Sequence, residues 1–385
     1  MTVLNGIDLL IRNPKALAGR KIGLVTNHSA VTRTLKSTVD AIAELPFVQI
    51  RALFAPEHGL QGSVQDGVPV VADTDLITAL PVYSLYGATV KPTREQLQDL
   101  DLLIFDVQDV GCRYYTYATT LSYVMESAAE HGIEVWVLDR PNPLNGDTVE
   151  GPLLDAYTSS FVGRYPVPPR HGLTIGEFAL WVQAEFIPKC NLRILRMRGW
   201  TRGMFWDQTG LTWVAPSPNL PTPGIAMLYP GLCLIEGTNL SEARGTTHPF
   251  ETFGAPWLGA NKLTKHLNGR GLRGVLFRQG SFVPTFSKFT GEACQAVQAH
   301  VINRHTFKAF ETGLEIIAAL IRLHPREFEF LASSWEANTP HFDLLTGSSS
   351  FREGLLAGKT PANMASDWKK DERRFARRRS RFLLY

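Results

Sequence analysis

Short apolar runs alternate with amphipathic stretches through the first half of the chain. Near-continuous apolar runs predict strands at residues 21–25, 50–54, 102–107 and 135–139. The helical period predicts helices at residues 35–45 and 119–131. Buried strands separated by helices indicate a parallel sheet that is covered on both faces. The predicted fold class is therefore α/β, with a Rossmann-like, mostly parallel sheet.

The pattern changes at residues 213–224, where four prolines fall within eight residues. Neither a helix nor a central strand accepts so many prolines. We therefore expect a domain connection, with a Rossmann-like N-terminal domain over residues 1–226 and a smaller α+β domain over residues 227–385 that closes a cleft. In the second domain the pattern predicts an αβ portion at 272–277 and helices at 291–303 and 306–323.

Three aromatic residues near the C-terminus, Trp368, Phe375 and Phe382, are spaced seven positions apart. This spacing places them near one face of a helix, with arginines around the rest. It predicts a docked terminal helix with a solvated basic face. A nucleic-acid role for the arginines is the alternative.

Composition narrows the class of protein. The chain has 385 residues, more than one hydrophobic core usually holds, and 44% of them are hydrophobic and 19% charged, which is typical of a globular protein. A net charge of +3 argues against a nucleic-acid partner. The four cysteines form no CxxC motif, so zinc, redox and disulfide roles are not indicated and no metal is expected.

The sequence shows no targeting or cofactor motif. The N-terminus lacks the regions of a signal peptide, and no window reaches the roughly 18 apolar residues of a spanning helix. We expect no membrane insertion and a cytoplasmic location, or a periplasmic or secreted one if a leader has been removed. No G-x-G-x-x-G follows the first strand and no G-x-x-x-x-G-K-[ST] occurs, so no cofactor and no nucleotide-dependent oxidoreductase is expected.

The most informative polar motif is Glu57-His58, which follows the predicted strand at 50–54. Open α/β sheets place their chemistry at the carboxyl ends of strands, and a Glu–His pair held there suits proton transfer. The alternative is structural: Glu57 caps a helix and His58 fills a polar niche.

Two further clusters follow predicted strands. Asp106 is followed by Arg113 and Tyr114, a combination that suits a sugar because aromatic faces stack on rings and guanidinium groups bind acids. Core packing of the tyrosines is the alternative. Arg140 and Asn142 follow another strand in a loop stiffened by two prolines, with an ion pair to the preceding aspartate as the alternative for Arg140.

Two loop segments add candidates. His171 precedes a helix whose Thr174 and Glu177 have capping-box spacing, so Glu177 is better explained by capping than by catalysis. Glu236 and Glu242 lie among small polar residues just past the domain connection, a composition that suits a polyhydroxylated ligand in an interdomain cleft. The chain has no G-x-S-x-G and no H-E-x-x-H, so hydrolysis by paired carboxylates is the reaction class that fits.

Taken together, these motifs resemble the NamZ-type exo-β-N-acetylmuramidases, a family formerly described as a domain of unknown function. The resemblance spans nearly the whole chain and rests on the segments 56–62, 84–87, 106–117, 139–143, 216–221, 236–246 and the closing 384–385. It implies a Rossmann-like domain, a smaller C-terminal domain, and release of N-acetylmuramic acid from the non-reducing end of peptidoglycan fragments. Peptidoglycan-derived saccharides are the implied partners.

With that resemblance, Glu57 is the leading catalytic acid. The other catalytic candidates are His58, Glu236 and Glu242. The candidates for substrate binding are Asn27, Asp106, Arg113, Tyr114, Arg140, Asn142, His171, Asn239 and Arg244. Cys112 and Ala243 depart from the family pattern, but both are conservative. The alternative function is that of a sugar-binding protein without catalysis. The sequence does not specify an oligomeric state.

Overall fold

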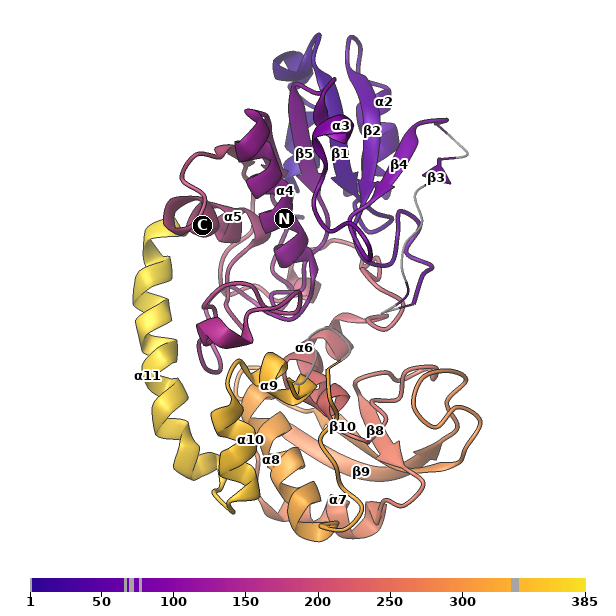
Figure 1. The fold of residues 1–385 in the computed structure, drawn as a ribbon, viewed down its shortest axis with the longest axis vertical. Coiled ribbons are helices and arrows are strands. Elements are labelled where there is room, and N and C mark those ends of the chain that lie inside the picture. The colour runs from indigo at the N-terminus through magenta and orange to yellow at the C-terminus, as the bar shows by residue number, and fades with distance from the viewer. Residues whose placement is uncertain (1, 66–67, 69–72, 76–77, 334–338) are drawn as a thin grey trace.

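The computed structural model describes residues 2–65, 68, 73–75, 78–333 and 339–385. Figure 1 shows two lobes, one above the other, with one long helix along the side of both. The upper lobe holds a seven-stranded sheet and the lower lobe a three-stranded sheet. Within the described ranges, no helix combines the length and apolarity that a membrane span needs.

The N-terminal sheet has the strand order β3-β4-β2-β1-β5-β6-β7. Its strands are β1 (Lys21–Thr26), β2 (Gln49–Ala55), β3 (Asp73–Thr74), β4 (Pro81–Ser84), β5 (Leu102–Asp106), β6 (Glu134–Leu138) and β7 (Asn191–Leu195). Neighbouring strands pair in parallel except β3 with β4. The predicted α/β class with a mostly parallel sheet is confirmed, and the four predicted strands correspond to β1, β2, β5 and β6.

Packing covers both faces of this sheet. The helices of the domain are α1 (Gly6–Leu10), α2 (Thr38–Ala43), α3 (Arg94–Leu97), α4 (Tyr117–His131) and α5 (Ile175–Glu185). Along β5, Leu102 and Ile104 belong to one buried cluster, whereas Leu103 and Phe105 belong to another. Because successive side chains of a strand point to opposite faces, two clusters mean that both faces are buried.

The C-terminal lobe combines helices with an antiparallel sheet of order β8-β10-β9. Its elements are α6 (Pro223–Leu232), β8 (Thr252–Ala255), α7 (Ala260–Gly269), β9 (Val275–Phe282), β10 (Cys294–Val301), α8 (Ala309–Leu323), α9 (His341–Thr346) and α10 (Ser349–Leu356). The helix predicted at 306–323 corresponds to α8. The α+β character of this smaller domain is therefore confirmed.

The helix predicted at residues 291–303 is wrong, because this segment forms strand β10. Its alanines and glutamines have fair helix propensity, but β10 is the central strand of the sheet and pairs with β8 on one side and β9 on the other. Two hydrogen-bonded neighbours outweigh a weak local preference. Burial of Cys294 and Ala296 beside the exposed Gln295 shows the alternation of a strand.

The proline-rich connection joins the two lobes. Residues 211–222 contain no helix or strand, and α6 begins at Pro223 with Thr222 as its cap. Helix α6 then packs against α8 of the C-terminal lobe. A division between residues 226 and 227 falls inside α6 and stays a prediction.

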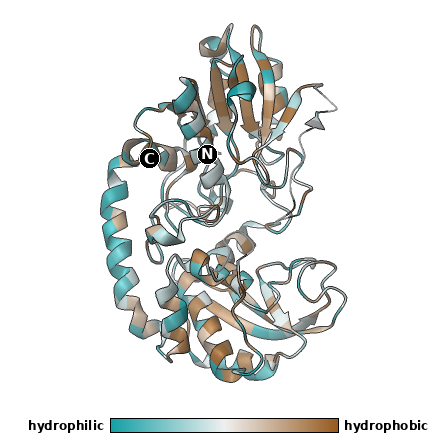
Figure 2. Ribbon diagram, in the orientation of Figure 1, coloured by the Kyte–Doolittle hydropathy of each residue, from teal (hydrophilic) through white to brown (hydrophobic). Residues whose placement is uncertain are grey.

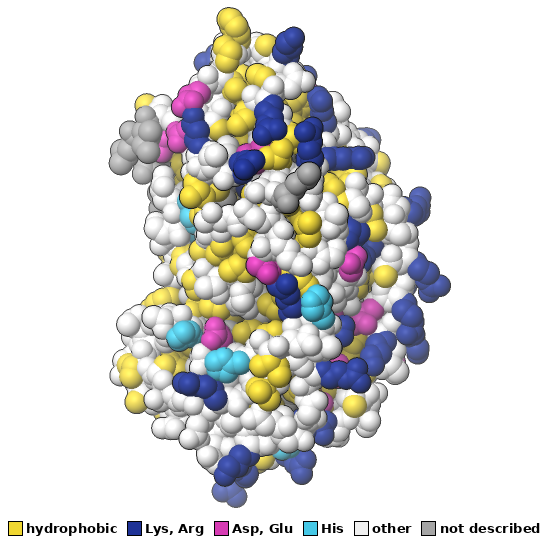
Figure 3. All heavy atoms as spheres, turned by 180° about the vertical axis from the view of Figure 1, so that it is seen from behind, with side chains coloured by type: hydrophobic (Ala, Val, Ile, Leu, Met, Phe, Trp, Pro, Cys, Tyr) yellow, Lys and Arg dark blue, Asp and Glu magenta, His cyan; other side chains and the backbone are white. Residues whose placement is uncertain are grey.

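The last helix, α11 (Pro361–Arg379), is the long helix at the side of both lobes in Figure 1. Trp368 packs against Phe310 of the C-terminal lobe, and Phe375 packs against Trp181 of the N-terminal lobe. The predicted docked helix is therefore confirmed. Its outer side is mostly hydrophilic in Figure 2, and Lys and Arg side chains gather along the same edge of the molecule in Figure 3.

Candidate active site

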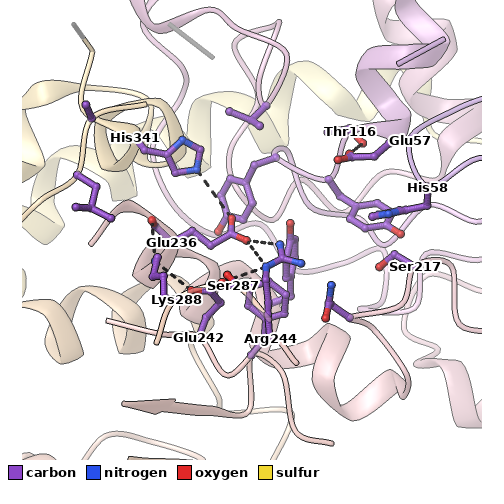
Figure 4. Close-up of a pocket in the computed structure, with 18 residues that line it drawn as sticks. Glu57, His58, Thr116, Ser217, Glu236, Glu242, Arg244, Ser287, Lys288 and His341 are labelled. Atoms are coloured by element: carbon purple, nitrogen blue, oxygen red, sulfur yellow. Dashed lines mark hydrogen bonds and ion pairs between the residues drawn. The ribbon is translucent and has the colours of Figure 1, made fainter. Parts of the chain in front are cut away.

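A pocket of about 260 Å³ lies where the two lobes meet. Its walls come from the loops after β2 and β5, from the loop that carries Val162, from the proline-rich connection, and from four segments of the C-terminal lobe. The polar residues that line it are Glu57, His58, Thr116, Ser217, Asn219, Glu236, Glu242, Arg244, Ser287, Lys288 and His341. Figure 4 shows the Glu57 side of the pocket facing the side formed by Glu236.

Glu57 enters the pocket from the carboxyl end of β2, which finishes at Ala55. The side chain is 7% exposed, and its Oε2 accepts a hydrogen bond of 2.6 Å from the Thr116 hydroxyl. Thr116 lies just before α4, beyond the end of β5. Two nearby strand ends therefore position one carboxyl group, as expected for an open α/β sheet.

His58 adopts a left-handed backbone conformation, with φ of 72°. Such a conformation is rare for residues other than glycine and is found at functional sites. Its Nδ1 lies 2.8 Å from the carbonyl oxygen of Val64, so Nδ1 carries the hydrogen and Nε2 is a proton acceptor. Burial lowers the pKa of His58, although the charge of Glu57 opposes this. The ring is therefore neutral at pH 7.

A compact ionic cluster forms the facing wall. Arg244 donates to Glu236 Oε1, with an Nε to Oε1 distance of 3.2 Å, and also pairs with Glu242 at 3.1 Å. Lys288 Nζ lies 3.1 Å from Glu242 Oε2. His341 Nε2 is 3.9 Å from Glu236 Oε2. Burial would raise the pKa of Glu236, but Arg244 and His341 outweigh burial and lower it, so Glu236 stays ionised.

Aromatic rings form a further part of the wall. The ring of Tyr229 lies 5.7 Å from Tyr114, 5.9 Å from Tyr115 and 4.8 Å from Phe250, measured between centroids. The Arg244 guanidinium lies over the Phe250 ring at 4.8 Å. Flat apolar faces beside charged groups suit a sugar, which has both hydroxyl groups and apolar ring faces.

The predicted site residues divide into two groups. Glu57, His58, Tyr114, Glu236, Glu242 and Arg244 line this pocket. The side chains of Asn27, Asp106, Arg113, Arg140, Asn142, His171 and Asn239 do not. Polar side chains at strand ends can also act as hydrogen-bond partners for the backbone groups of buried loops. The residues that do not line the pocket have such structural roles.

Asp106 and Arg140 form a buried ion pair at the ends of β5 and β6. Arg140 Nε lies 2.5 Å from Asp106 Oδ1, and both side chains are almost fully buried. Arg140 Nη2 also donates to the Val31 carbonyl oxygen at 3.1 Å. The pair therefore joins neighbouring loops of the sheet.

Arg113 is also buried and binds carbonyl oxygens. Its guanidinium donates to Pro152 at 3.1 Å, to Val167 at 2.8 Å and to Leu345 at 2.6 Å. Leu345 belongs to α9 of the C-terminal lobe, so Arg113 holds loops of both lobes together.

The remaining four side chains also bind loop groups. Asn142 donates to the Leu173 carbonyl oxygen at 2.9 Å, and His171 accepts from the Leu173 amide at 3.1 Å. Asn27 donates to the Tyr117 hydroxyl, and Asn239 binds the backbone of residues 327 and 329.

Sequence reasoning did not select several residues that line the pocket. Thr116 and Asn219 lie within motifs that were noted for other residues, so membership in those motifs could have identified them from the sequence. Lys288 and His341 lie outside those motifs and reach the pocket through tertiary folding. Among the described residues, no group of three or more His, Cys, Asp or Glu side chains could hold a metal ion.

Comparisons with known proteins agree with this geometry. The family model for the N-terminal domain of the exo-beta-N-acetylmuramidase NamZ matches residues 22–224, and the model for its C-terminal domain matches residues 227–385. The chain is 46% identical over 384 residues to a protein of Bacillus subtilis named peptidoglycan beta-N-acetylmuramidase NamZ, covering 100% of this chain and 91% of that protein.

Solved structures show the same fold. Crystal structures of two DUF1343 family proteins from Bacteroides fragilis superpose with TM-scores of 0.90 and 0.79, at 37% and 29% identity. Each match covers 100% of this chain and 99% of the other. The motifs, the two-lobed fold and the matched models lead to one conclusion: the chain belongs to the NamZ family of exo-β-N-acetylmuramidases.

Proposed function

We propose that this protein is an exo-acting β-N-acetylmuramidase that removes N-acetylmuramic acid from the non-reducing end of peptidoglycan fragments. The observation that carries the proposal is the placement of Glu57 and the ionised Glu236 on facing walls of one pocket. Glycosidases use two carboxyl groups on either side of the scissile bond. The similarity to the Bacillus subtilis enzyme supports the choice of substrate.

Glu57 is the general acid. The hydrogen bond from Thr116 fixes its Oε2, and no described residue engages Oε1, which is left for the substrate. Glu57 gives its proton to the glycosidic oxygen as the bond from that oxygen to the anomeric carbon breaks. The neutral ring of His58 beside it accepts a proton at Nε2, which helps to move protons to and from Glu57 during turnover.

Glu236 is the second carboxylate. Arg244 and His341 keep it ionised, so it stabilises the positive charge that develops at the anomeric carbon. Glu242 is less suitable, because it is 2% exposed and its two oxygens are engaged by Arg244 and Lys288. Water then adds to the anomeric carbon and gives up a proton, which restores Glu57 as the acid and completes hydrolysis.

The size of the pocket supports exo-action. A volume of about 260 Å³ is below the roughly 300–1,000 Å³ of drug-sized ligand sites. It suits one sugar ring better than a run of several. A terminal sugar at a chain end therefore fits this pocket, and the fit supports exo-action.

The experiment that tests the proposal compares two chromogenic substrates. The protein is incubated with an aryl β-N-acetylmuraminide and with the corresponding β-N-acetylglucosaminide, which lacks only the lactyl group. We expect turnover of the muraminide at a much higher kcat/KM. Binding of the muraminide without turnover would favour a sugar-binding protein and contradict the proposal.

A further inference from the structure

Lys288 makes an unusual set of contacts at the edge of the pocket. It lies in the loop between β9 and β10, and its Nζ approaches four oxygen atoms. These are the carbonyl oxygens of Ile235 at 3.4 Å, Glu236 at 3.2 Å and Leu240 at 2.8 Å, and the carboxylate of Glu242 at 3.1 Å. One ammonium group thus binds both ends of the segment that carries Glu236.

The backbone around Lys288 is strained. Ser287 and Phe289, on either side of it, both have left-handed conformations, with φ of 70° and 60°. Each costs free energy for a residue with a side chain, so the surrounding structure must compensate. Strain of this kind is concentrated at functional sites, and Ser287 itself lines the pocket.

The same loop is fastened to the residue after Arg244. The backbone amide and hydroxyl of Thr285 both donate to the Gly245 carbonyl oxygen, at 3.0 and 2.9 Å. A Cβ atom at Gly245 would lie 2.7 Å from the Phe286 nitrogen, so only glycine permits this approach. The loop is therefore built to hold the segment from Glu236 to Arg244.

Charge explains why Lys288 is needed beside Arg244. Glu242 is almost fully buried, and a buried carboxylate needs a charged partner. Lys288 supplies one, so Arg244 is shared between Glu242 and Glu236. Without Lys288, Glu242 would draw Arg244 away from Glu236.

We propose that Lys288 is a positioning residue for hydrolysis, which holds the Glu236 segment and, through Glu242, keeps Arg244 on Glu236. This inference rests on the proposed function of Glu236. Lys288 need not touch the sugar, because its donors point to protein oxygens. Its loss should therefore lower kcat and leave KM nearly unchanged.

The test uses the full-length protein and an aryl β-N-acetylmuraminide. Lys288→Met is expected to lower kcat roughly 10- to 100-fold, the loss typical of a charge-assisted hydrogen bond, with KM within about twofold. Lys288→Arg, which keeps the charge, should recover part of that kcat. Lys265→Met removes an exposed lysine of α7 and is the matched control, expected to behave as wild type.

A double-mutant cycle separates positioning from general damage. In the double variant, Glu242→Gln should recover part of the kcat that Lys288→Met loses, because a neutral side chain at position 242 no longer draws Arg244 away from Glu236. Lys288→Gln, which removes the charge and retains hydrogen-bond donors, carries the test if Lys288→Met does not fold.

Two results would overturn the inference: wild-type kcat in Lys288→Met, or in Lys288→Gln where that variant carries the test, and a double variant that recovers none of the lost kcat. If the wild-type protein itself fails to release the sugar, the proposed function fails instead, so the two failures are distinguishable.

Discussion

The Thr116 hydroxyl donates a 2.6 Å hydrogen bond to Glu57 Oε2 inside the interdomain pocket. The two residues are brought together because β2 and β5 flank β1 in the sheet, so their carboxyl ends lie close to each other. This contact fixes the direction of the carboxyl group. The chemistry proposed for Glu57 depends on that direction.

Thr116→Val should therefore lower kcat while leaving KM nearly unchanged. Valine keeps the shape of the side chain and removes the donor, so we expect a loss of roughly 10-fold or more, by the usual strength of a hydrogen bond to the carboxylate that Glu57 becomes as it gives up its proton. Thr120→Val, in the helix that follows Thr116, is the control, because among the described residues its hydroxyl binds only the Thr116 carbonyl oxygen. Steady-state kinetics of both variants would settle the point, and equal rates would contradict it.

The lactyl carboxylate of muramic acid needs a cation, and the structure separates Arg113 and Arg244, two arginines that the sequence offers for substrate binding. Arg244 lines the pocket, whereas Arg113 is buried on three carbonyl oxygens. Arg244→Met should lower both activities, because Arg244 keeps Glu236 ionised, and should weaken muraminide hydrolysis more than residual glucosaminide hydrolysis. Arg113→Met should lower the melting temperature and leave the ratio of the two activities unchanged. An Arg244 variant that loses both activities equally would assign Arg244 to holding the glutamates alone.

Sequence patterns predicted the sheet well because its strands are apolar on both faces and its helices have a clear period. They failed at β10, where partners distant in the chain decide the conformation. The sequence patterns also placed Asp106 and Arg140 at the edge of the sheet where the carboxyl ends of the strands lie and where function was expected. Both are at that edge, but they face each other across neighbouring strand ends, a relation that sequence alone does not specify.

The pocket itself shows a similar limit. Glu57 and Glu236 stand out in the sequence because each lies in a long polar motif. Lys288 lies 46 positions after Glu242, between a serine and a phenylalanine, and only the folded loop reveals its partners. Its strained neighbours are Ser287 and Phe289, whereas glycine and asparagine are the residues that usually mark a left-handed turn in a sequence.

The chain end is tied to the N-terminal sheet. The Tyr385 hydroxyl donates to Asp139 Oδ2 at 2.7 Å and accepts from the Met197 amide at 2.8 Å. Tyr385→Phe should lower the free energy of unfolding by about 1–3 kcal/mol, because the Met197 amide is left unpaired and Asp139 Oδ2 keeps only its hydrogen bond from Thr174. Urea unfolding checks this, with Tyr157→Phe at an exposed position as the control. A midpoint unchanged in both variants would contradict it.

His171 should make stability depend on pH. Burial, with the nearby charges of Arg379 and Arg113, lowers the pKa of His171 to about 3, against an ordinary value near 6.5. Below pH 6.5 the unfolded chain binds a proton that the folded protein does not, so stability falls as the pH falls.

Between pH 7 and pH 5, His171 should lower the free energy of unfolding by about 2 kcal/mol, because the loss is roughly 1.4 kcal/mol for each pH unit below 6.5. His171→Asn retains an acceptor for the Leu173 amide and removes the titration. Urea unfolding at the two pH values should therefore show a smaller loss in the variant than in wild type. An equal loss would show that His171 does not titrate in this way.

The most direct test of the whole account is the release of N-acetylmuramic acid from a muropeptide that ends in this sugar, measured by mass spectrometry for wild type and Glu57→Gln. Glutamine retains the shape of Glu57 and removes its proton, so we expect release by wild type and a rate lower by roughly 10²–10⁴-fold in the variant. An aryl substrate, whose leaving group needs little protonation, should lose less. Release by Glu57→Gln at the wild-type rate would contradict the account.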